Sequence, residues 1–270
     1  VEFKNRIEDI EHPIVREALR LMEIDFPIEI TTFADIPAGT GLGSSSSFAV
    51  GLMHALYALK GQFVTKYTLA ESAAKIEVSI LKRTMGKQDH FAAAYGDLNV
   101  LTFHANEKVT VEPIFCSPKA HSKLESNLLL FYTKLKRDAS EVLQVQNRQT
   151  SQKRAVLREM KNLVTPLREA LSENGDLNQV GEILHENWQL KKSLTGIISS
   201  SEIDEYYIKA RRAGAIGGKL LGAGGGGFLM FYVEPEKQKS VVDALNGLFH
   251  FQVGLDTSGT RITYYDQTDK

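Results

Sequence analysis

The sequence is poor in the features that mark secreted, membrane-spanning and nucleic-acid-binding proteins. Cys116 is the only cysteine, so no intrachain disulfide can form and nothing indicates an oxidising compartment. No apolar run approaches the roughly 20 residues that a membrane-spanning helix needs. The formal net charge is −1, and no run of five or more basic residues offers a field to nucleic acid or to an anionic membrane. We therefore expect a cytoplasmic protein that binds neither nucleic acid nor a membrane.

The most informative segment is residues 37–47, Pro-Ala-Gly-Thr-Gly-Leu-Gly-Ser-Ser-Ser-Ser, which precedes an apolar-periodic stretch at 48–59. Its glycines let the backbone turn tightly and approach a ligand, and its serines stand where a helix N-cap and first turn are expected. A helix N-terminus offers unpaired N–H groups and the positive end of a dipole, which favour phosphate. We predict that the phosphates of a nucleotide bind at Pro37, Gly39, Gly41, Leu42, Gly43, Ser44, Ser45, Ser46 and Ser47.

Hydrophobic periodicity predicts mostly helices in the first half of the chain. A strand at 28–33 leads into the glycine-serine segment by its alternation and β-branched content. The first helix is predicted to end near residues 19–22, and three more helices are predicted at 48–59, 66–81 and 88–95. Two further strands are predicted at 98–103 and 109–115. The polar segment 117–122 is the best candidate for a domain boundary, which gives domains 1–120 and 121–270.

The second half alternates between predicted strands and helices, which indicates an α+β arrangement. The predicted strands are 127–132, 215–221, 228–233 and 261–265, and the predicted helices are 140–171, 177–192, 201–212, with Ser201 as N-cap, and 236–249. The helix at 177–192 places His185, Trp188 and Lys191 on one face, where core packing is the favoured role for Trp188. The run from Gly222 to Gly227 lies between two predicted strands.

Three common nucleotide-binding motifs are excluded. A Walker loop needs Gly-x-x-x-x-Gly-Lys followed by Ser or Thr, and neither Lys87 nor Lys219 lies in that context. The glycines at 222–227 match Gly-x-Gly-x-x-Gly, but a strand follows them where a dinucleotide fold needs a helix. The glycine-serine segment also lacks the strand and lysine that follow the glycine loop of protein kinases.

Two motifs in order resemble the superfamily of galactokinases, homoserine kinases, mevalonate kinases and phosphomevalonate kinases, abbreviated GHMP. Residues 37–47 are similar to its second motif, and Leu-Leu-Gly-Ala-Gly-Gly-Gly-Gly-Phe at 220–228 is similar to its third. The segments 86–96, 184–192 and 214–222 resemble the kinases of D-glycero-D-manno-heptose 7-phosphate and the kinase half of bifunctional fucokinases. No counterpart of the family's first motif precedes Pro37, so we expect that N-terminal segment to be missing from this sequence.

The resemblance implies an α+β GHMP kinase fold of two domains, an α/β N-terminal domain with the phosphate loop and a ferredoxin-like α+β C-terminal domain. It implies ATP and Mg²⁺ as cofactors, a sugar phosphate as partner, and a monomer or homodimer. The implied reaction is phosphorylation of the anomeric hydroxyl of D-glycero-D-manno-heptose 7-phosphate to the 1,7-bisphosphate. Two alternatives stay open: an anomeric kinase for another sugar such as fucose, and a nucleotide-binding sensor without catalysis.

The resemblance also assigns roles to charged residues. Asp89 would accept the proton of the attacking sugar hydroxyl, although an isolated aspartate here would more often cap the short helix. Glu77 would hold Mg²⁺ together with Ser45, or with Ser44 as the next choice; its alternative is a solvated helix residue. Independently of the resemblance, Lys87 and Lys219 each follow a glycine in a candidate site segment, where a lysine would neutralise phosphoryl charge; the alternative is a solvated surface lysine.

Candidate residues for recognising the sugar phosphate lie in the second half of the chain. Arg137 is the candidate clamp for a 7-phosphate, because a planar guanidinium suits phosphate; the alternative is the polar end of a strand. Gly224 and Gly225 are expected near the substrate, in a glycine turn that lets two strands approach the phosphate loop. His54 is expected to be structural.

Overall fold

The computed structural model describes residues 1–36, 39–135, 139–172 and 175–266. The chain divides into two compact units. Unit 1 comprises Val1–Ala38, Gly43–Asp97 and Asp256–Lys270, and unit 2 comprises Gly39–Leu42 and Leu98–Leu255. The glycine-serine segment is therefore shared, with its middle glycines grouped with unit 2 and its serines with unit 1. The division into domains 1–120 and 121–270 stays a prediction.

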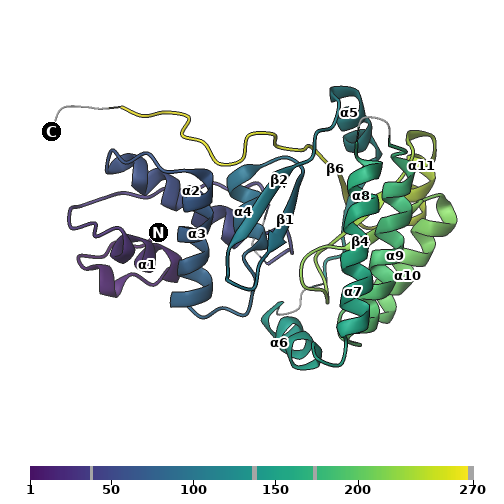
Figure 1. Cartoon of the computed structure of the whole chain (residues 1–270), viewed down its shortest axis with the longest axis horizontal. Helices are drawn as coiled ribbons and strands as arrows, with labels where there is room; N and C mark the ends of the chain where they lie inside the picture. Colours follow the sequence, from purple (N-terminus) through teal and green to yellow (C-terminus); the bar gives the residue numbers. More distant parts are fainter. Residues whose placement is uncertain (37–38, 136–138, 173–174, 267–270) are drawn as a thin grey trace. The chain divides into compact units, whose positions relative to one another are not determined.

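Unit 1 is helical in its described part (Figure 1). Its elements are η1 Ile7–Asp9, α1 Pro13–Leu21, α2 Ser44–Leu59, α3 Lys66–Ala74, η2 Lys75–Ile80 and α4 Gln88–Tyr95. The core forms where apolar faces of α2, α3 and α4 meet, with Leu56, Leu69, Ile76 and Phe91 almost fully buried. The helices predicted at 48–59, 66–81 and 88–95 are confirmed.

The predicted helix at 66–81 contains a change of geometry. After α3 the chain continues as η2, a π-helical segment with wider turns. Such segments are rare and frequently lie at functional sites. Glu77 lies within η2 and is buried, whereas Ile80, at the end of η2, is 38% exposed.

The strand predicted at 28–33 is wrong: these residues have no regular secondary structure. Phe33 is 95% exposed, and no strand pairs with this segment in the described part of unit 1. An alternating sequence forms a strand only when a neighbour accepts its backbone hydrogen bonds, so the local pattern alone was insufficient.

Unit 2 contains two antiparallel sheets. β1 Asn99–Phe103 and β2 Val109–Pro113, at the positions of the strands predicted at 98–103 and 109–115, pair as an antiparallel hairpin. A four-stranded sheet has the order β4-β5-β3-β6, formed by β4 Gly217–Leu220, β5 Phe228–Tyr232, β3 Leu128–Tyr132 and β6 Phe249–Gln252. Leu130 faces Met230 across β3 and β5, which fixes the register at the sheet's centre.

Helices flank the four-stranded sheet (Figure 1). They are α5 Pro118–Asn127, α6 Ala139–Gln149, α7 Arg154–Asn162, α8 Val164–Ala170, α9 Asn178–Leu194, α10 Ser201–Ala213 and α11 Pro235–Ala244. Trp188, Tyr207, Phe231 and Val241 lie in one buried cluster, so α9, α10 and α11 share a core with the sheet. The core-packing role predicted for Trp188 is confirmed, as is the mixed helix-and-sheet class.

The polar segment 117–122, the candidate domain boundary, forms the start of α5, where Ser117 Oγ accepts a hydrogen bond from Ala120 N at 3.2 Å. Three other expectations for the second half of the chain need correction. Ser200, not Ser201, caps α10. The helix predicted to reach 249 ends at Ala244, and the last strand is β6, while residues 261–265, predicted as a strand, have no regular structure. Gly247, with φ 95°, lies between the end of α11 and the start of β6. β6 pairs with β3 and is the edge strand of the four-stranded sheet.

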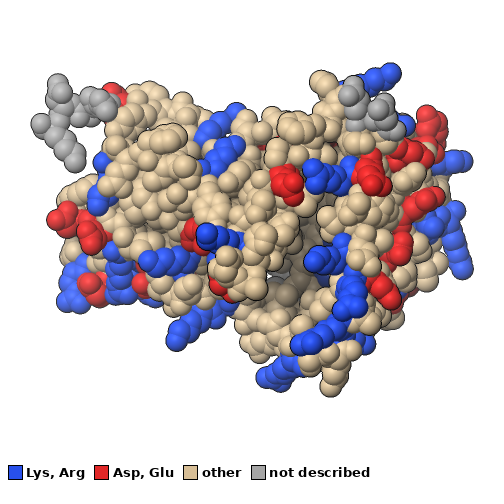
Figure 2. All heavy atoms as spheres, viewed as in Figure 1, with Lys and Arg blue, Asp and Glu red and all other residues tan. Residues whose placement is uncertain are grey.

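The surface carries no dominant charge. Figure 2 shows basic and acidic side chains together on the face in view, in keeping with the formal net charge of −1. No helix in the described ranges is both long enough and apolar enough to cross a bilayer.

Candidate active site

The N-terminus of α2 has no side-chain cap. Gly43 occupies the N-cap position with φ 69°, a left-handed conformation that glycine adopts without strain. The predicted serine N-cap is therefore wrong, and the N–H groups of the first turn lack the acceptor that a serine cap would supply. Ser46 is fully buried, and its Oγ has no hydrogen-bond partner among the described residues. These polar groups suit an anion.

The glycines of the two motifs approach each other within unit 2. A Cβ at Gly41 would lie 3.0 Å from the carbonyl oxygen of Leu221, and a Cβ at Gly222 would lie 2.7 Å from the Cα of Gly41. Both glycines have positive φ, at 81° and 69°. Only residues without side chains permit this approach, as the sequence predicted for the glycine turn.

Asp89 lies beside the start of α2, within unit 1. A Cβ at Gly43 would lie 3.4 Å from the Asp89 carboxylate oxygen Oδ2, which is ordinary contact distance. Burial raises the pKa of the Asp89 carboxyl; the His90 charge opposes this rise and the Glu77 charge adds to it. Asp89 does not cap its helix, because Lys87 is the N-cap residue of α4 and makes no side-chain cap. The helix cap considered for Asp89 is therefore not formed, and its catalytic role stays a prediction.

Glu77 is fully buried and hydrogen-bonded through both oxygens. Oε1 accepts from Arg83 Nη1 at 2.5 Å, and Oε2 accepts from His90 Nε2 at 2.9 Å. Burial alone would raise the pKa of this carboxyl, but the hydrogen bonds from His90 and Ser45 and the charge of Arg83 lower it below its usual value. Glu77 is therefore an ionised carboxylate next to Ser45, not the solvated helix residue of the alternative.

Arg83 and His90 are site residues that the sequence reasoning missed. His90 directly follows Asp89 in the segment 86–96, so its place in the sequence could have indicated that it belongs to the site. Arg83 follows the end of η2, and no periodicity or spacing pointed to it. Its contact with Glu77 depends on how the chain turns after η2, with Arg83 N donating to the Glu77 carbonyl at 2.9 Å.

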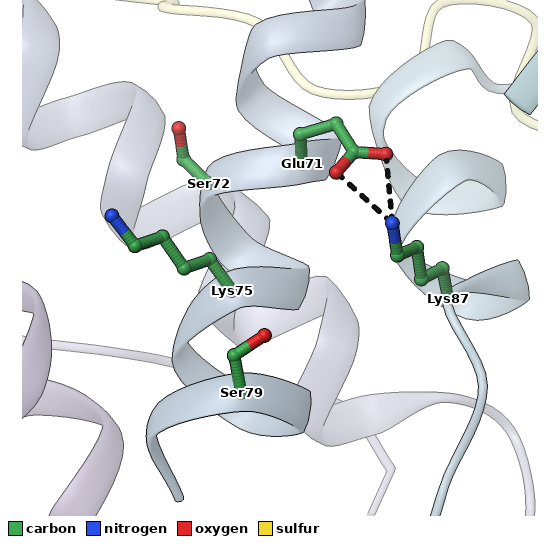
Figure 3. Close-up of a pocket in the computed structure, with 5 residues that line it drawn as sticks. All are labelled: Glu71, Ser72, Lys75, Ser79 and Lys87. Carbon is green, nitrogen blue, oxygen red and sulfur yellow. Dashed lines mark hydrogen bonds and ion pairs between the residues drawn. The ribbon is translucent and has the colours of Figure 1, made fainter. Parts of the chain in front are cut away.

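Lys87 points to Glu71 and lies at a surface pocket (Figure 3). Its Nζ lies 3.2 Å from Glu71 Oε2 and 3.3 Å from Oε1. The pocket has a volume of about 380 Å³ and is lined by Glu71, Ser72, Lys75, Ser79 and Lys87. The phosphoryl-neutralising role of Lys87 stays a prediction.

Lys219, on β4, and Lys191, on α9, belong to two elements that pack against each other in unit 2. Burial lowers the pKa of Lys219, and burial together with repulsion from Lys219 lowers the pKa of Lys191 to about 8. Lys191 Nζ donates a hydrogen bond to the Gly222 carbonyl at 2.5 Å, which places it at the glycine turn. The sequence reasoning singled out Lys219 and left Lys191 without a role.

Of the remaining predicted residues, two fall outside the described part of the chain, and the others make contacts within the protein. Pro37 and Arg137 fall in the undescribed ranges, so their roles stay predictions. Gly225 N donates to the Ile198 carbonyl at 2.9 Å, and a Cβ at Gly224 would touch Ile198. His54 Nδ1 pairs with Thr260 Oγ1 at 3.0 Å, in keeping with a structural role.

The residues present fit ATP and Mg²⁺. The open N-terminus of α2 and the unpartnered Ser46 Oγ suit a phosphate. Ser45 and Glu77 offer adjacent oxygens, the ligand type that Mg²⁺ prefers. No group of three or more His, Cys, Asp or Glu side chains that could hold a metal occurs in the described ranges, so a Mg²⁺ ion would take its other ligands from phosphate and water.

Comparison with known proteins gives matches in both units. Residues 13–97 match the GHMP kinases N terminal domain, and residues 167–250 match the GHMP kinases C terminal domain. The D-glycero-alpha-D-manno-heptose 7-phosphate kinase of Campylobacter jejuni is 32% identical over 216 residues, which cover 79% of this chain and 63% of that protein. A Pyrococcus furiosus galactokinase is 30% identical over 241 residues, covering 78% and 66%.

A solved structure shares the fold. The crystal structure of a D-glycero-D-manno-heptose 1-phosphate kinase from Bacteroides thetaiotaomicron superposes with a TM-score of 0.71 at 29% identity, over 94% of this chain and 74% of that one. The chain spans about two thirds of the length of the two curated relatives named above. The two domain matches, in order along the sequence, and the shared fold show that this chain belongs to the GHMP kinase family.

Proposed function

We propose that this chain carries the catalytic core of an ATP-dependent sugar kinase. The proposed reaction transfers the terminal phosphate of ATP to the anomeric hydroxyl of D-glycero-D-manno-heptose 7-phosphate, which gives the 1,7-bisphosphate. The observation that carries the proposal is the position of the Asp89 carboxylate beside Gly43, at the start of α2, since this puts a proton acceptor next to the candidate phosphate-binding turn. The substrate is suggested by the heptose 7-phosphate kinase that this chain resembles.

Asp89 would act as the proton acceptor. A sugar hydroxyl is a weak nucleophile, and a carboxylate within hydrogen-bond reach takes its proton as the oxygen bonds to phosphorus. The bond from that phosphorus to the bridging oxygen breaks, and ADP leaves with the electron pair. Because burial raises the pKa of Asp89, its carboxylate binds a proton more readily than an exposed aspartate.

Glu77 and its neighbours would prepare the nucleotide side. The N–H groups at the start of α2 would bind phosphate oxygens, while Ser45 and Glu77 would hold Mg²⁺. When bound, Mg²⁺ neutralises charge on the phosphates. Arg83 and His90 keep Glu77 ionised and fix both of its oxygens, so they position the carboxylate without touching the reactants.

The test is a panel of acceptors with ATP and Mg²⁺, followed by location of the new phosphate by ³¹P NMR. The panel holds heptose 7-phosphate, heptose 1-phosphate, free heptose, fucose and galactose. We expect turnover with heptose 7-phosphate and a new phosphate on the anomeric carbon. Phosphorylation elsewhere on the sugar, or no turnover on any acceptor, would contradict the proposal.

Fucose is the second candidate acceptor. The bifunctional fucokinase/GDP-fucose pyrophosphorylase of Arabidopsis thaliana is 29% identical over 84% of this chain. A fucokinase needs no site for a second phosphate, so a preference for fucose over heptose 7-phosphate would favour this candidate. A chain that binds ATP yet phosphorylates none of the sugars would instead favour the nucleotide-binding sensor.

A further inference from the structure

The lysine pair, Lys191 and Lys219, comes from two elements that pack closely. α9 runs along β4, with Gly181 beside Gly217 and Lys191 at the glycine turn just beyond the strand. A side chain at Gly217 would overlap the backbone of Gly181, so the glycines allow the helix to approach the strand. Side chains alternate along a strand, so Lys219 lies on the same face of β4 as Gly217, the face that meets α9 at Gly181. Lys191 Nζ lies at the Gly222 carbonyl, three residues further along the chain.

The charge of the lysine pair is not balanced by the protein. No carboxylate of the described residues forms an ion pair with either lysine, and the polar contact of Lys191 is an uncharged carbonyl. The next residue along the helix behaves differently: Lys192 pairs with Asp204 at 3.0 Å and lies over the Trp188 ring. Two like charges in a partly buried position repel each other and lose hydration, which an anion would relieve.

We infer that Lys191 and Lys219 together bind one phosphate dianion of a reactant, next to the glycine turn in unit 2. A dianion matches the two cations, and lysine binds phosphate as a point charge. The lowered pKa of both groups is what two desolvated, unpaired ammonium groups should show. The inference rests on the proposed function for the choice of reactants, which are a sugar phosphate and ATP.

The test measures binding without turnover. The full chain is titrated with inorganic phosphate while the ¹³Cε signals of lysine are followed by NMR, with assignments from Lys191→Met and Lys219→Met. Lys192→Met is the matched control, because it removes a neighbouring lysine that already has a carboxylate partner. We expect the wild-type Lys191 and Lys219 signals to shift together, and each of the two variants to weaken phosphate binding at the remaining lysine by about tenfold.

Two further arms distinguish the source of the phosphate. In one, a non-hydrolysable ATP analogue with Mg²⁺ is added first and phosphate second; in the other, heptose 7-phosphate replaces inorganic phosphate. If the pair binds the sugar phosphate, both signals still respond after the analogue saturates; if it binds the terminal nucleotide phosphate, the analogue alone shifts them. Either response supports the dianion site.

The inference is overturned if no phosphate source shifts the two signals, or if Lys192→Met weakens binding as much as Lys191→Met. These results are independent of the sugar panel. A chain that phosphorylates heptose 7-phosphate with unresponsive lysines would keep the proposed function and lose the site. A chain that binds phosphate at the lysine pair but phosphorylates no sugar would keep the phosphate site and contradict the proposed function.

Discussion

Two clusters of partly or fully buried charge differ in how the protein balances them. In unit 1 the Glu77 carboxylate receives hydrogen bonds from Arg83 and His90, so the fold itself satisfies both oxygens. In unit 2, Lys191 and Lys219 form no ion pair with a carboxylate of the described chain. A balanced charge is held in place whether or not a ligand is bound, whereas an unbalanced pair gains most when an anion arrives.

This difference separates a charge that the fold itself holds from a pair of charges that is available to an anion. The Glu77 cluster keeps one carboxylate ionised beside Ser45, and Asp89, next in space, has a pKa shifted in the opposite direction. Two carboxyl groups with opposed shifts suit different tasks, one as a permanent anion and one as a proton acceptor. The lysine pair provides the complementary charge for phosphate.

The largest effect is expected from Asp89→Asn, which removes the proposed proton acceptor from unit 1. Turnover should fall by about 100- to 10,000-fold, because the amide cannot accept the hydroxyl proton. The dissociation constant of ATP, measured by calorimetry, should change by no more than about threefold, since the Asp89 carboxylate donates no hydrogen bond to phosphate. Near-normal turnover in this variant would show that Asp89 is not the base.

Glu77→Gln tests the balanced cluster. The neutral amide weakens the contacts with Arg83 and His90, and chemical denaturation should show a loss of about 2 kcal/mol in the free energy of unfolding. Apparent Mg²⁺ affinity in the kinase assay should fall as well. Unchanged stability would mean that the buried contacts around Glu77 contribute nothing net.

Lys191→Met tests the unbalanced pair through stability. Removing one of two repelling cations should raise the free energy of unfolding by about 1 kcal/mol at pH 7, even as phosphate binding weakens. The wild type should also gain stability as pH rises from about 8 toward 10.5, since the unfolded lysine holds its proton to higher pH than folded Lys191 does. Thermal scans between pH 7 and 10 measure both, and the pH-dependent gain should be smaller in the variant.

The smallest effect is expected from Glu71→Gln, at the partly exposed pair with Lys87. Such pairs contribute under about 1 kcal/mol, so denaturation should resolve little change. The variant is therefore the matched control for Glu77→Gln, because both remove one carboxylate charge from adjacent helical segments. Equal losses in the two variants would erase the contrast between buried and exposed carboxylates.

Local features of the sequence predicted most helices of unit 1 and the hairpin-forming strands of unit 2. α4 has the predicted limits because Gly96, with φ 68°, stops it. The failures at 28–33 and 261–265 concern strands, whose formation depends on a partner elsewhere in the chain. The change to π-helical geometry at η2 was also not predicted, because the hydrophobic periodicity of residues 66–81 is that of a single helix.

By itself, the sequence determined the family and the ingredients of the site: a glycine-serine turn before a helix, two carboxylates and a glycine-rich hairpin. These are local signals, set by glycine's backbone freedom and by helical periodicity. The tertiary structure alone decided that Arg83 and His90 enclose Glu77 and that Lys191 joins Lys219. Whether a charge is balanced depends on distances between side chains and on their burial, and packing fixes both.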